Sequence, residues 1–200
     1  MPRPNVEKER REQILEAAMI CFSRKGYHAT SMDDITAELP FSKALIYYYF
    51  KTKRAVFMSI LEDWMQKTTL LWETMLSAED NATTQLHKCM EYGVQLILQF
   101  SDLARVEFEF YAEAGRDEEV RRVIQKIFSR FRDEFQQILE NGITDGEFRH
   151  VNTEALSAVL FGMYEGLAMQ AIVEPDTFDW SIVLESMLDM VMRGISPLEA

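Results

Sequence analysis

The sequence is poor in the residues that build disulfide frameworks and metal sites. Two cysteines, Cys21 and Cys89, occur among 200 residues, far apart and each within an apolar helical pattern. Two cysteines without a close spacing specify neither a disulfide framework nor a metal site. We therefore expect two buried free thiols in a reducing cytoplasm.

Glycine and histidine are also scarce, which argues against several classes of enzyme site. The eight glycines form no phosphate-binding loop and no nucleophile elbow. The three histidines are scattered, and the Glu147–His150 spacing, which resembles half of a di-iron motif, has no second copy. We expect no metal, no cofactor and no enzymatic activity.

Long apolar runs are missing too. The chain contains no uninterrupted stretch of about 18 apolar residues, the length that a membrane-spanning helix requires. The first residues lead directly into a charged stretch and contain no apolar signal region. We expect a protein without a membrane partner that acts in the cytoplasm.

The charge is unevenly distributed. The net charge of −12 by itself argues against a nucleic-acid partner. Residues 1–60, however, carry ten Lys and Arg against seven Asp and Glu, whereas residues 61–200 carry eleven against 26. A mildly basic N-terminal part on an acidic remainder is compatible with DNA binding, provided that the N-terminal part alone touches phosphate.

The hydrophobic periodicity is helical from end to end, and no stretch shows the sustained alternation of a strand. Turn and cap residues divide the chain into about nine helices, which predicts an all-α fold. Gly26 suits the C-cap of the first helix, Ser31–Asp34 resembles a capping box, and Pro40 ends the second helix by Glu38. Asn141-Gly142 is expected to end the seventh helix.

Three short helices in the first 50 residues, the last two joined by a tight turn, are the elements of a helix-turn-helix. In the third helix, Ile46 and Phe50 can share one apolar face. The other face presents lysines, tyrosines and the small Ala44, because the aromatic run 47–50 cannot all point inward at 3.6 residues per turn. Tyrosine and lysine are good phosphate ligands, so this face is predicted to bind DNA.

The first 60 residues resemble the DNA-binding head of the tetracycline-repressor (TetR) family. The matching positions are Glu12–Ala18, Phe22, Gly26, Tyr27, Thr30, Ser31, Ile35, Ser42, Lys43, Tyr47–Phe50, Lys51 and Lys53. The remaining 140 residues resemble the family in helix number and length. The resemblance implies a DNA-binding domain over residues 1–52 and a larger ligand-binding and dimerisation domain over residues 53–200.

The resemblance also implies roles for individual residues. Ser42 caps the recognition helix, and Lys43, Ala44 and Leu45 would face base edges in the major groove. Tyr47, Tyr48 and Tyr49 would pack on the DNA backbone and neighbouring bases. Three further residues would hold phosphates: Thr30, Ser31 and Lys53.

Two departures from the family pattern affect the operator sequence. The chain has Leu39-Pro40 where the family has a small residue and then glycine, so the turn must take another shape. It also has Ala44-Leu45 where the family commonly has glycine and then threonine. Leu45 donates no side-chain hydrogen bond, so we predict an apolar contact with a thymine methyl group.

The remainder of the chain suggests an effector pocket and a dimer. Aromatic and methionine side chains line pockets for apolar ligands, and the resemblance implies such a pocket for a small, mostly hydrophobic effector. The ligand-binding residues are predicted to be Trp64, Trp72, Phe100, Phe108, Tyr111 and Phe131. Small residues from Ala155 to Ala168 and the apolar segment 182–191 predict a four-helix interface in a homodimer.

The leading interpretation is thus a ligand-responsive regulator that binds a palindromic double-stranded DNA operator. The resemblance implies a repressor, since repression is usual in that family. The main alternative is a helical protein-interaction module with a non-functional DNA-binding head.

Overall fold

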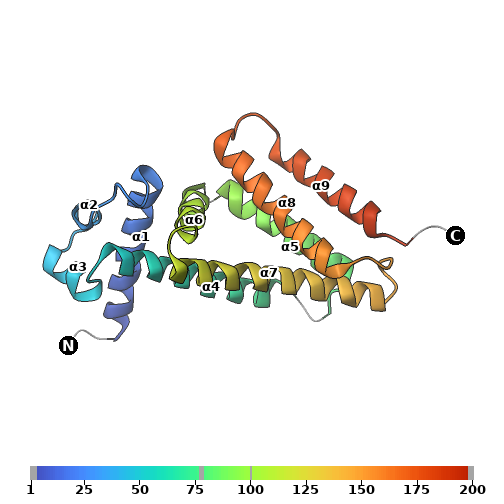
Figure 1. Ribbon diagram of the computed structural model, residues 1–200, viewed down its shortest axis with the longest axis horizontal. Helices are drawn as coiled ribbons and strands as arrows, with labels where there is room; N and C mark the ends of the chain where they lie inside the picture. The colour runs from blue at the N-terminus through green and yellow to red at the C-terminus, as the bar shows by residue number, and fades with distance from the viewer. Residues whose placement is uncertain (1–3, 77–78, 100, 198–200) are drawn as a thin grey trace. The chain divides into compact units, whose positions relative to one another are not determined.

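All of the regular structure described in the computed structural model is helical, and it comprises nine helices (Figure 1). The structure describes residues 4–76, 79–99 and 101–197, with side chains except at residues 4–5, 68, 71–73, 93–99 and 101–104. The helices are α1 (Pro4–Lys25), α2 (Met32–Ala37), α3 (Lys43–Tyr49), α4 (Lys53–Met75), α5 (Ala82–Gln99), α6 (Ser101–Ala114), α7 (Glu118–Thr144), α8 (Thr153–Val173) and α9 (Trp180–Ile195). The predicted all-α fold is confirmed.

Local sequence signals place the first helix boundaries correctly. Gly26 follows α1 with φ of +78°, the left-handed conformation that glycine adopts without steric cost. Ser31 and Asp34 form the predicted capping box at α2, and Ser42 caps α3 by accepting a hydrogen bond from the Leu45 N–H. Apart from glycines, no residue in the described ranges has a positive φ, so the turn at Leu39-Pro40 avoids the left-handed region, as proline requires.

The end of α7 differs from the sequence-based expectation. The helix does not close at Asn141-Gly142 but continues to Thr144, and Gly146, with φ of +78°, is the left-handed residue that follows. A Cβ atom on Gly142 would lie 2.2 Å from Cδ2 of Phe148. Gly142 is therefore needed for the close approach of the Phe148 ring. In the sequence, this packing glycine looks like a glycine that ends a helix.

The chain divides into two compact units. The first comprises Met1–Lys67 and Asp102–Ile124, and the second comprises Thr68–Ser101 and Gln125–Ala200. The first unit thus holds α1–α3 together with the first part of α4, nearly all of α6 and the start of α7. The domain boundary between residues 52 and 53 stays a prediction.

The core of the first unit is centred on Phe57 of α4. Its side chain is 1% exposed, and its ring centroid lies 5.8 Å from that of Phe22, 4.1 Å from that of Tyr27 and 4.4 Å from that of Phe110. The other fully buried apolar side chains of this unit come from α1–α4 and α6: Ile14, Ala18, Ile35, Ile46, Val56, Leu61 and Val106. Burial of these rings fixes α1, α4 and α6 against one another.

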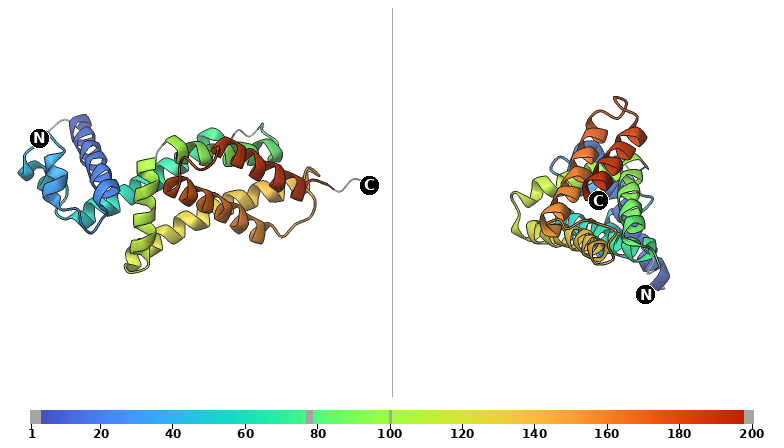
Figure 2. Two further views of the ribbon diagram at one scale, coloured as in Figure 1. Left: turned by 90° about the horizontal axis from the view of Figure 1, so that it is seen from above. Right: turned by 90° about the vertical axis from the view of Figure 1, so that its right-hand side faces the viewer.

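The second unit is a helical bundle in which α8 and α9 run side by side in opposite directions (Figure 2). Its core combines α5, α7, α8 and α9 through buried residues such as Leu86, Leu139, Leu160 and Leu188. Cys89 belongs to this core, and Cys21 is buried in the first unit, so the expected buried free thiols are confirmed. Burial raises the pKa of both thiols, which disfavours the reactive thiolate.

Helix α8 combines a buried side with an exposed apolar side. Ala168 is buried against Tyr164 and Leu184, so it does not belong to an exposed small-residue stripe as the sequence suggested. Of the described helices, α8 alone is long and apolar enough to cross a membrane by length and composition, with 28% of the relevant window buried. A core helix of a soluble protein passes the same test, so this observation does not establish a membrane span.

Glu147 has a structural role that explains why half of a metal motif occurs there. Its Oε1 accepts a hydrogen bond from the N–H of Ala82 at 3.0 Å, and its Oε2 accepts one from the N–H of Thr83 at 3.0 Å. The carboxylate therefore caps the N-terminus of α5, where backbone N–H groups lack helical partners. His150 is exposed, and the described residues contain no group of ligands that could hold a metal ion.

We expect the variant Glu147→Gln to be about 1 kcal/mol less stable at neutral pH, since the charged cap is lost. Desolvation raises the pKa of Glu147, but hydrogen bonds from Thr83 and Ala82 outweigh it and leave the pKa lowered. A lowered pKa means that this stabilisation exists above the unfolded pKa and is lost as the pH falls through the folded pKa. Urea unfolding at pH 7 and pH 3 should show the gap between variant and native protein narrowing in acid. Glu91→Gln on α5 is the control, and a gap that is the same at both pH values would contradict the prediction.

Candidate nucleic-acid interface

Helix α3 has the two faces that the sequence predicts. Ile46 is fully buried and Phe50 is 5% exposed, whereas Lys43 and Ala44 are exposed and Tyr48 is 60% exposed. Leu45, Tyr47 and Tyr49 are half-buried, and the Tyr48 and Tyr49 rings meet edge to face at 5.2 Å between centroids. The exposed side of α3 is therefore aromatic and basic, and it rests on an apolar side that anchors the helix.

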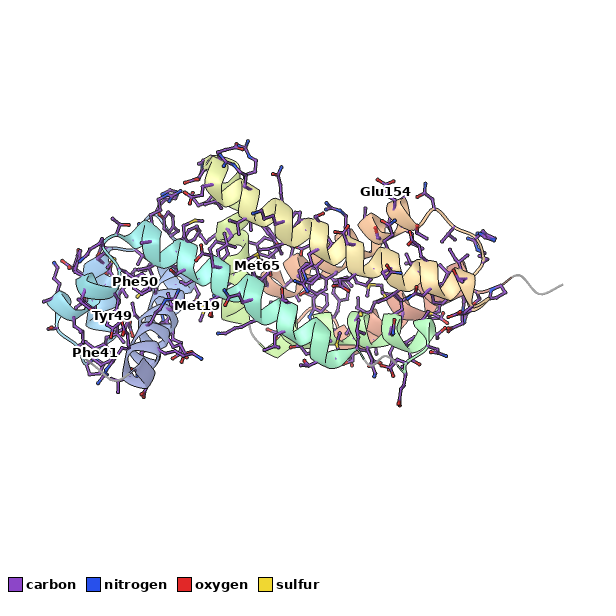
Figure 3. All side chains as sticks on the ribbon, turned by 90° about the horizontal axis from the view of Figure 1, so that it is seen from below. Met19, Phe41, Tyr49, Phe50, Met65 and Glu154 are labelled. Carbon is purple, nitrogen blue, oxygen red and sulfur yellow. The ribbon has the colours of Figure 1, made fainter. Side chains whose placement is uncertain are left out.

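Two arginines of α1 contact aromatic rings just before and just after α3, and the sequence did not reveal these contacts. The Arg10 guanidinium lies 4.1 Å from the ring centroid of Phe41, and that of Arg11 lies 5.7 Å from that of Phe50. Phe41 and Phe50 bracket the two ends of α3 (Figure 3). Cation–π contacts of this kind fix positive charge next to the ring. The charge excess of residues 1–60 was the sequence signal, but it did not say which arginines adjoin α3.

Lys43, at the start of α3, forms an ion pair with Asp33 of α2. The two charged atoms are 2.5 Å apart, and both side chains are more than half exposed. The hydrogen bond to Asp33, together with its charge, raises the pKa of Lys43, so the ammonium group stays charged. A DNA contact by Lys43 has to compete with Asp33.

The N-terminus of α2 already carries a carboxylate. Asp34 Oδ2 accepts hydrogen bonds from the N–H and the hydroxyl of Ser31, and Lys25 Nζ contacts Asp34 Oδ1. The hydrogen bond from Lys25, followed by those from Ser31, holds the pKa of Asp34 well below its usual range. Ser31 is exposed, but its N–H and hydroxyl are engaged in the capping box, which a phosphate would have to displace.

The Thr30 hydroxyl, predicted to bind phosphate, lies inside the protein in this structure, and its phosphate contact stays a prediction. Its side chain is 2% exposed, and its hydroxyl lies within hydrogen-bonding distance of the carbonyl oxygens of Cys21 and Gly26. Because the hydroxyl is buried and satisfied inside the protein, it is not available to DNA in this conformation. Thr30 joins the end of α1 to the start of α2.

Lys53 is likewise engaged inside the protein. Its Nζ donates to the carbonyl oxygens of Tyr27, His28 and Thr30 at 2.5, 3.1 and 2.7 Å, and it lies 4.5 Å from the Tyr27 ring centroid. An ammonium group has three N–H donors, so these three bonds use its full capacity. Desolvation by burial lowers its pKa. The expected phosphate contact would require Lys53 to release this turn.

Where the structure describes them, the residues predicted to bind an effector each contact another aromatic ring. Trp64 stacks on Phe110 at 6.3 Å, Phe108 meets Tyr111 edge to face at 5.8 Å, and Phe131 stacks on Phe161 at 5.5 Å. The first two pairs belong to the first unit and the third to the second unit. The side chain of Trp72, and Phe100 as a whole, lie outside the described residues. A shared pocket therefore stays a prediction.

Two family models match the chain. Residues 14–60, from the middle of α1 to the first part of α4, match the model described as bacterial regulatory proteins, tetR family. Residues 84–196 match the model described as the C-terminal part of BetI-type transcriptional repressors. Together they cover both the helix-turn-helix and most of the remaining helices.

Relatives and solved structures agree with these matches. The chain is 32% identical over 184 residues to the HTH-type transcriptional regulator YfiR of Bacillus subtilis, covering 84% of this chain and 85% of the relative. It is 25% identical over 159 residues to the HTH-type transcriptional regulator QacR of Staphylococcus aureus, covering 78% and 83%.

Solved structures share the fold. A Saccharomonospora viridis protein described as a transcriptional regulator, in complex with choline, superposes with a TM-score of 0.87 at 22% identity, covering 96% of this chain and 100% of that one. The regulator FadR of Bacillus subtilis, in complex with stearoyl-CoA, superposes with a TM-score of 0.79 at 22% identity, covering 92% and 98%.

The relatives are transcriptional regulators, and the exposed basic and aromatic face of α3 is present in this chain. An interaction module with a non-functional head is therefore not favoured. The chain belongs to the tetR family of bacterial regulatory proteins and is a DNA-binding transcriptional regulator with an N-terminal helix-turn-helix.

Proposed function

We propose that this regulator binds a palindromic operator as a homodimer, represses transcription from it, and is released by a small, mostly hydrophobic effector. The observation that carries the DNA-binding part is the exposed side of α3, where Tyr48 is 60% exposed beside Lys43 and Ala44. A cation, an aromatic hydroxyl and a small residue on one exposed side are the groups that contact phosphates and base edges.

In the complex, α3 lies in the major groove. Lys43, Ala44 and Leu45 face base edges, with Leu45 against a thymine methyl group, and Ser42 lies at the helix N-terminus near the backbone. Tyr47, Tyr48 and Tyr49 pack on the sugar–phosphate backbone. Arg10 and Arg11 of α1 add positive charge near the two ends of α3, and Lys43 leaves Asp33 to contact DNA.

The dimer forms through α8 and α9. Apart from Glu154 in its first turn and Gln170, the exposed residues of α8 are small or apolar: Ala155, Ala158, Val159, Gly162, Gly166, Met169 and Val173. A Cβ atom on Gly162 or Gly166 would meet nothing within 4 Å, so a second helix can approach closely. Two-fold symmetry then presents two copies of α3 to half-sites one helical turn, about 34–36 Å, or a multiple of it apart.

The effector is an apolar or partly apolar molecule. Choline and stearoyl-CoA, named with two structures of the same fold, differ greatly in size and polarity, which agrees with an adaptable aromatic pocket in this fold. In this chain the predicted lining is aromatic, and the carboxylate of Glu107 accepts a hydrogen bond from the Tyr111 hydroxyl at 2.7 Å. Glu107 therefore orients Tyr111 on α6.

The test selects bound sequences from a random duplex library and then measures affinity for the selected duplex. We expect Tyr48→Ala and Lys43→Ala each to weaken binding about ten-fold, because a contact to backbone or base contributes about 1–3 kcal/mol. Lys43→Ala should also reduce the dependence of affinity on salt, since one phosphate or base contact to a cation is removed.

Lys67→Ala is the matched control, because Lys67 is also an exposed lysine paired with an aspartate, Asp63. Its affinity should equal that of the native protein. Adding choline or stearoyl-CoA to the native complex tests release by a cationic and by a long-chain acyl compound. If both α3 variants bound the selected duplex as tightly as the native protein, the assignment of α3 would be wrong.

A further inference from the structure

The turn between α1 and α2, residues 26–30, is held by a carboxylate from far along the chain. The N–H of Tyr27 donates to Oε2 of Glu109 on α6 at 3.1 Å. Oε1 of the same carboxylate lies 3.1 Å from the position that a Cβ atom on Gly26 would occupy. Glycine at position 26 is favoured by its positive φ, and a Cβ atom there would also crowd the carboxylate of Glu109.

A second carboxylate of α6 holds the next residue of this turn. Oε1 of Glu113 lies 2.6 Å from Nε2 of His28, and Arg116 lies 3.4 Å from the same oxygen. The Glu113 side chain is only 12% exposed. A carboxylate that is removed from water needs polar partners, so the contact with His28 ties α6 to the turn.

Helix α4 holds the same turn from its carbonyl side. The Nζ of Lys53 donates to carbonyl oxygens of three residues of this turn, Tyr27, His28 and Thr30. The next residue, Arg54, pairs with Asp117 and Glu119 just after α6. The hydrogen bond from Arg54 is the main cause of the lowered pKa of Asp117. Helix α6 therefore holds the Tyr27 N–H and the His28 ring of this turn, and α4 holds three of its carbonyl groups.

The predicted effector side of α6 is opposite to the side that holds the turn. At 100° per residue, Val106, Glu109, Phe110 and Glu113 fall on one side of the helix, and Phe108 and Tyr111 fall on the other. Val106 and Phe110 are buried, the latter against Phe57, whereas Phe108 and Tyr111 are half-buried and contact each other. A displacement of α6 by a ligand at Phe108 and Tyr111 must therefore move Glu109 and Glu113.

We propose that Glu109 and Glu113 are positioning residues that couple α6 directly to the helix-turn-helix through the turn 26–30, which we call the coupling turn. This inference rests on the proposed function, because it assigns the route by which an effector alters DNA affinity. The coupling turn is followed immediately by Ser31, the cap of α2, and α2 leads to the recognition helix α3. A shift of α6 thus reaches α3 without requiring α4 to bend.

The first experiment needs no DNA. Amide hydrogen exchange at Tyr27 is measured in the free, full-length protein. Glu109→Ala removes the acceptor, and we expect exchange at least ten-fold faster than in the native protein. Glu109→Gln retains an oxygen that accepts the same bond and should stay close to native. Unchanged exchange in a folded Glu109→Ala variant would show that Glu109 does not hold the Tyr27 N–H, and the proposed link between α6 and the turn would be wrong.

The second experiment uses the reciprocity of coupling between two sites. If a shift of α6 alters DNA binding by the helix-turn-helix, DNA binding must in turn alter α6. With the selected duplex as the probe, exchange over residues 105–114 should slow in the native protein. Glu118→Gln is the control, since Glu118 is 59% exposed and pairs with Arg121 and Arg122 of its own helix. In the double variant Glu109→Ala/Glu113→Ala, DNA still binds but the slowing should shrink at least five-fold.

The outcomes separate this inference from the proposed function. If the double variant bound the duplex and α6 slowed as in the native protein, coupling would run elsewhere and the proposal would be overturned. If the native protein selected no duplex, the proposed function would fail, while the exchange of Tyr27 would still decide whether Glu109 holds the turn.

Discussion

Replacing Phe57 with alanine should lower the free energy of unfolding by about 3–5 kcal/mol, the usual cost of removing a fully buried phenylalanine side chain. Phe57 is 1% exposed, and its ring contacts those of Phe22, Tyr27 and Phe110. The cavity would therefore open between α1, α4 and α6. Because domains of this size are stable by about 5–15 kcal/mol, the loss is a large part of the total.

The cost should appear as a lower denaturant midpoint in urea, followed by circular dichroism and by tryptophan fluorescence. Trp64 stacks on Phe110, next to the cavity, and reports on the first unit. Leu70→Ala is the control on the same helix, because Leu70 is 61% exposed and its truncation should cost less than about 1 kcal/mol. A loss below about 1 kcal/mol for Phe57→Ala would show that Phe57 is not the centre of this core.

The fold was predictable from sequence where local chemistry decides it. Gly26, Ser31 and Ser42 act within one helical turn of their own positions, so their effect on α1, α2 and α3 is readable from neighbouring residues. The exposed face of α3 was predictable for the same reason, since the period of a helix forces part of an aromatic run outward. These signals depend on sequence separations of three or four residues.

What the sequence could not reveal depends on contacts between distant segments. Thr30 and Lys53 have the residue types of phosphate ligands, yet both bond to carbonyl oxygens of the α1–α2 connection. Glu109, 82 positions from Tyr27 along the chain, gives no local sign that it binds a backbone N–H. Gly142 looks like a helix stop, and only the position of Phe148 reveals its packing role. Pairings of this kind require the tertiary structure.

The variant Gly162→Glu tests the proposed dimer interface, and its expected effect on dimer formation and DNA affinity is the second large one. Position 162 lies in the middle of α8, on its exposed side, and an added Cβ atom would meet nothing within 4 Å. Glutamate is a better helix former than glycine by roughly 0.5–1 kcal/mol, so the isolated subunit should fold at least as well as the native one. The charge, however, would be buried without a partner in the proposed four-helix interface.

We expect Gly162→Glu to be monomeric in analytical ultracentrifugation and to bind the selected duplex at least 100-fold more weakly. The size of this loss follows from effective concentration, since a second head linked through the dimer adds a factor of about 10²–10⁴ to affinity. A stable dimer of this kind buries about 800 Å² on each partner, and α8 and α9 expose Val159, Met169, Ile182 and Met190 for it.

The control is Gly194→Glu, at the C-terminal end of α9, where an added Cβ atom also meets nothing within 4 Å. It introduces the same side chain away from the middle of α8, so it should remain dimeric and bind DNA like the native protein. A folded Gly162→Glu variant that sediments as a dimer would place the interface elsewhere. A variant that becomes monomeric yet keeps full affinity would instead show that one helix-turn-helix suffices for operator binding, because the two-fold arrangement would then contribute nothing to it.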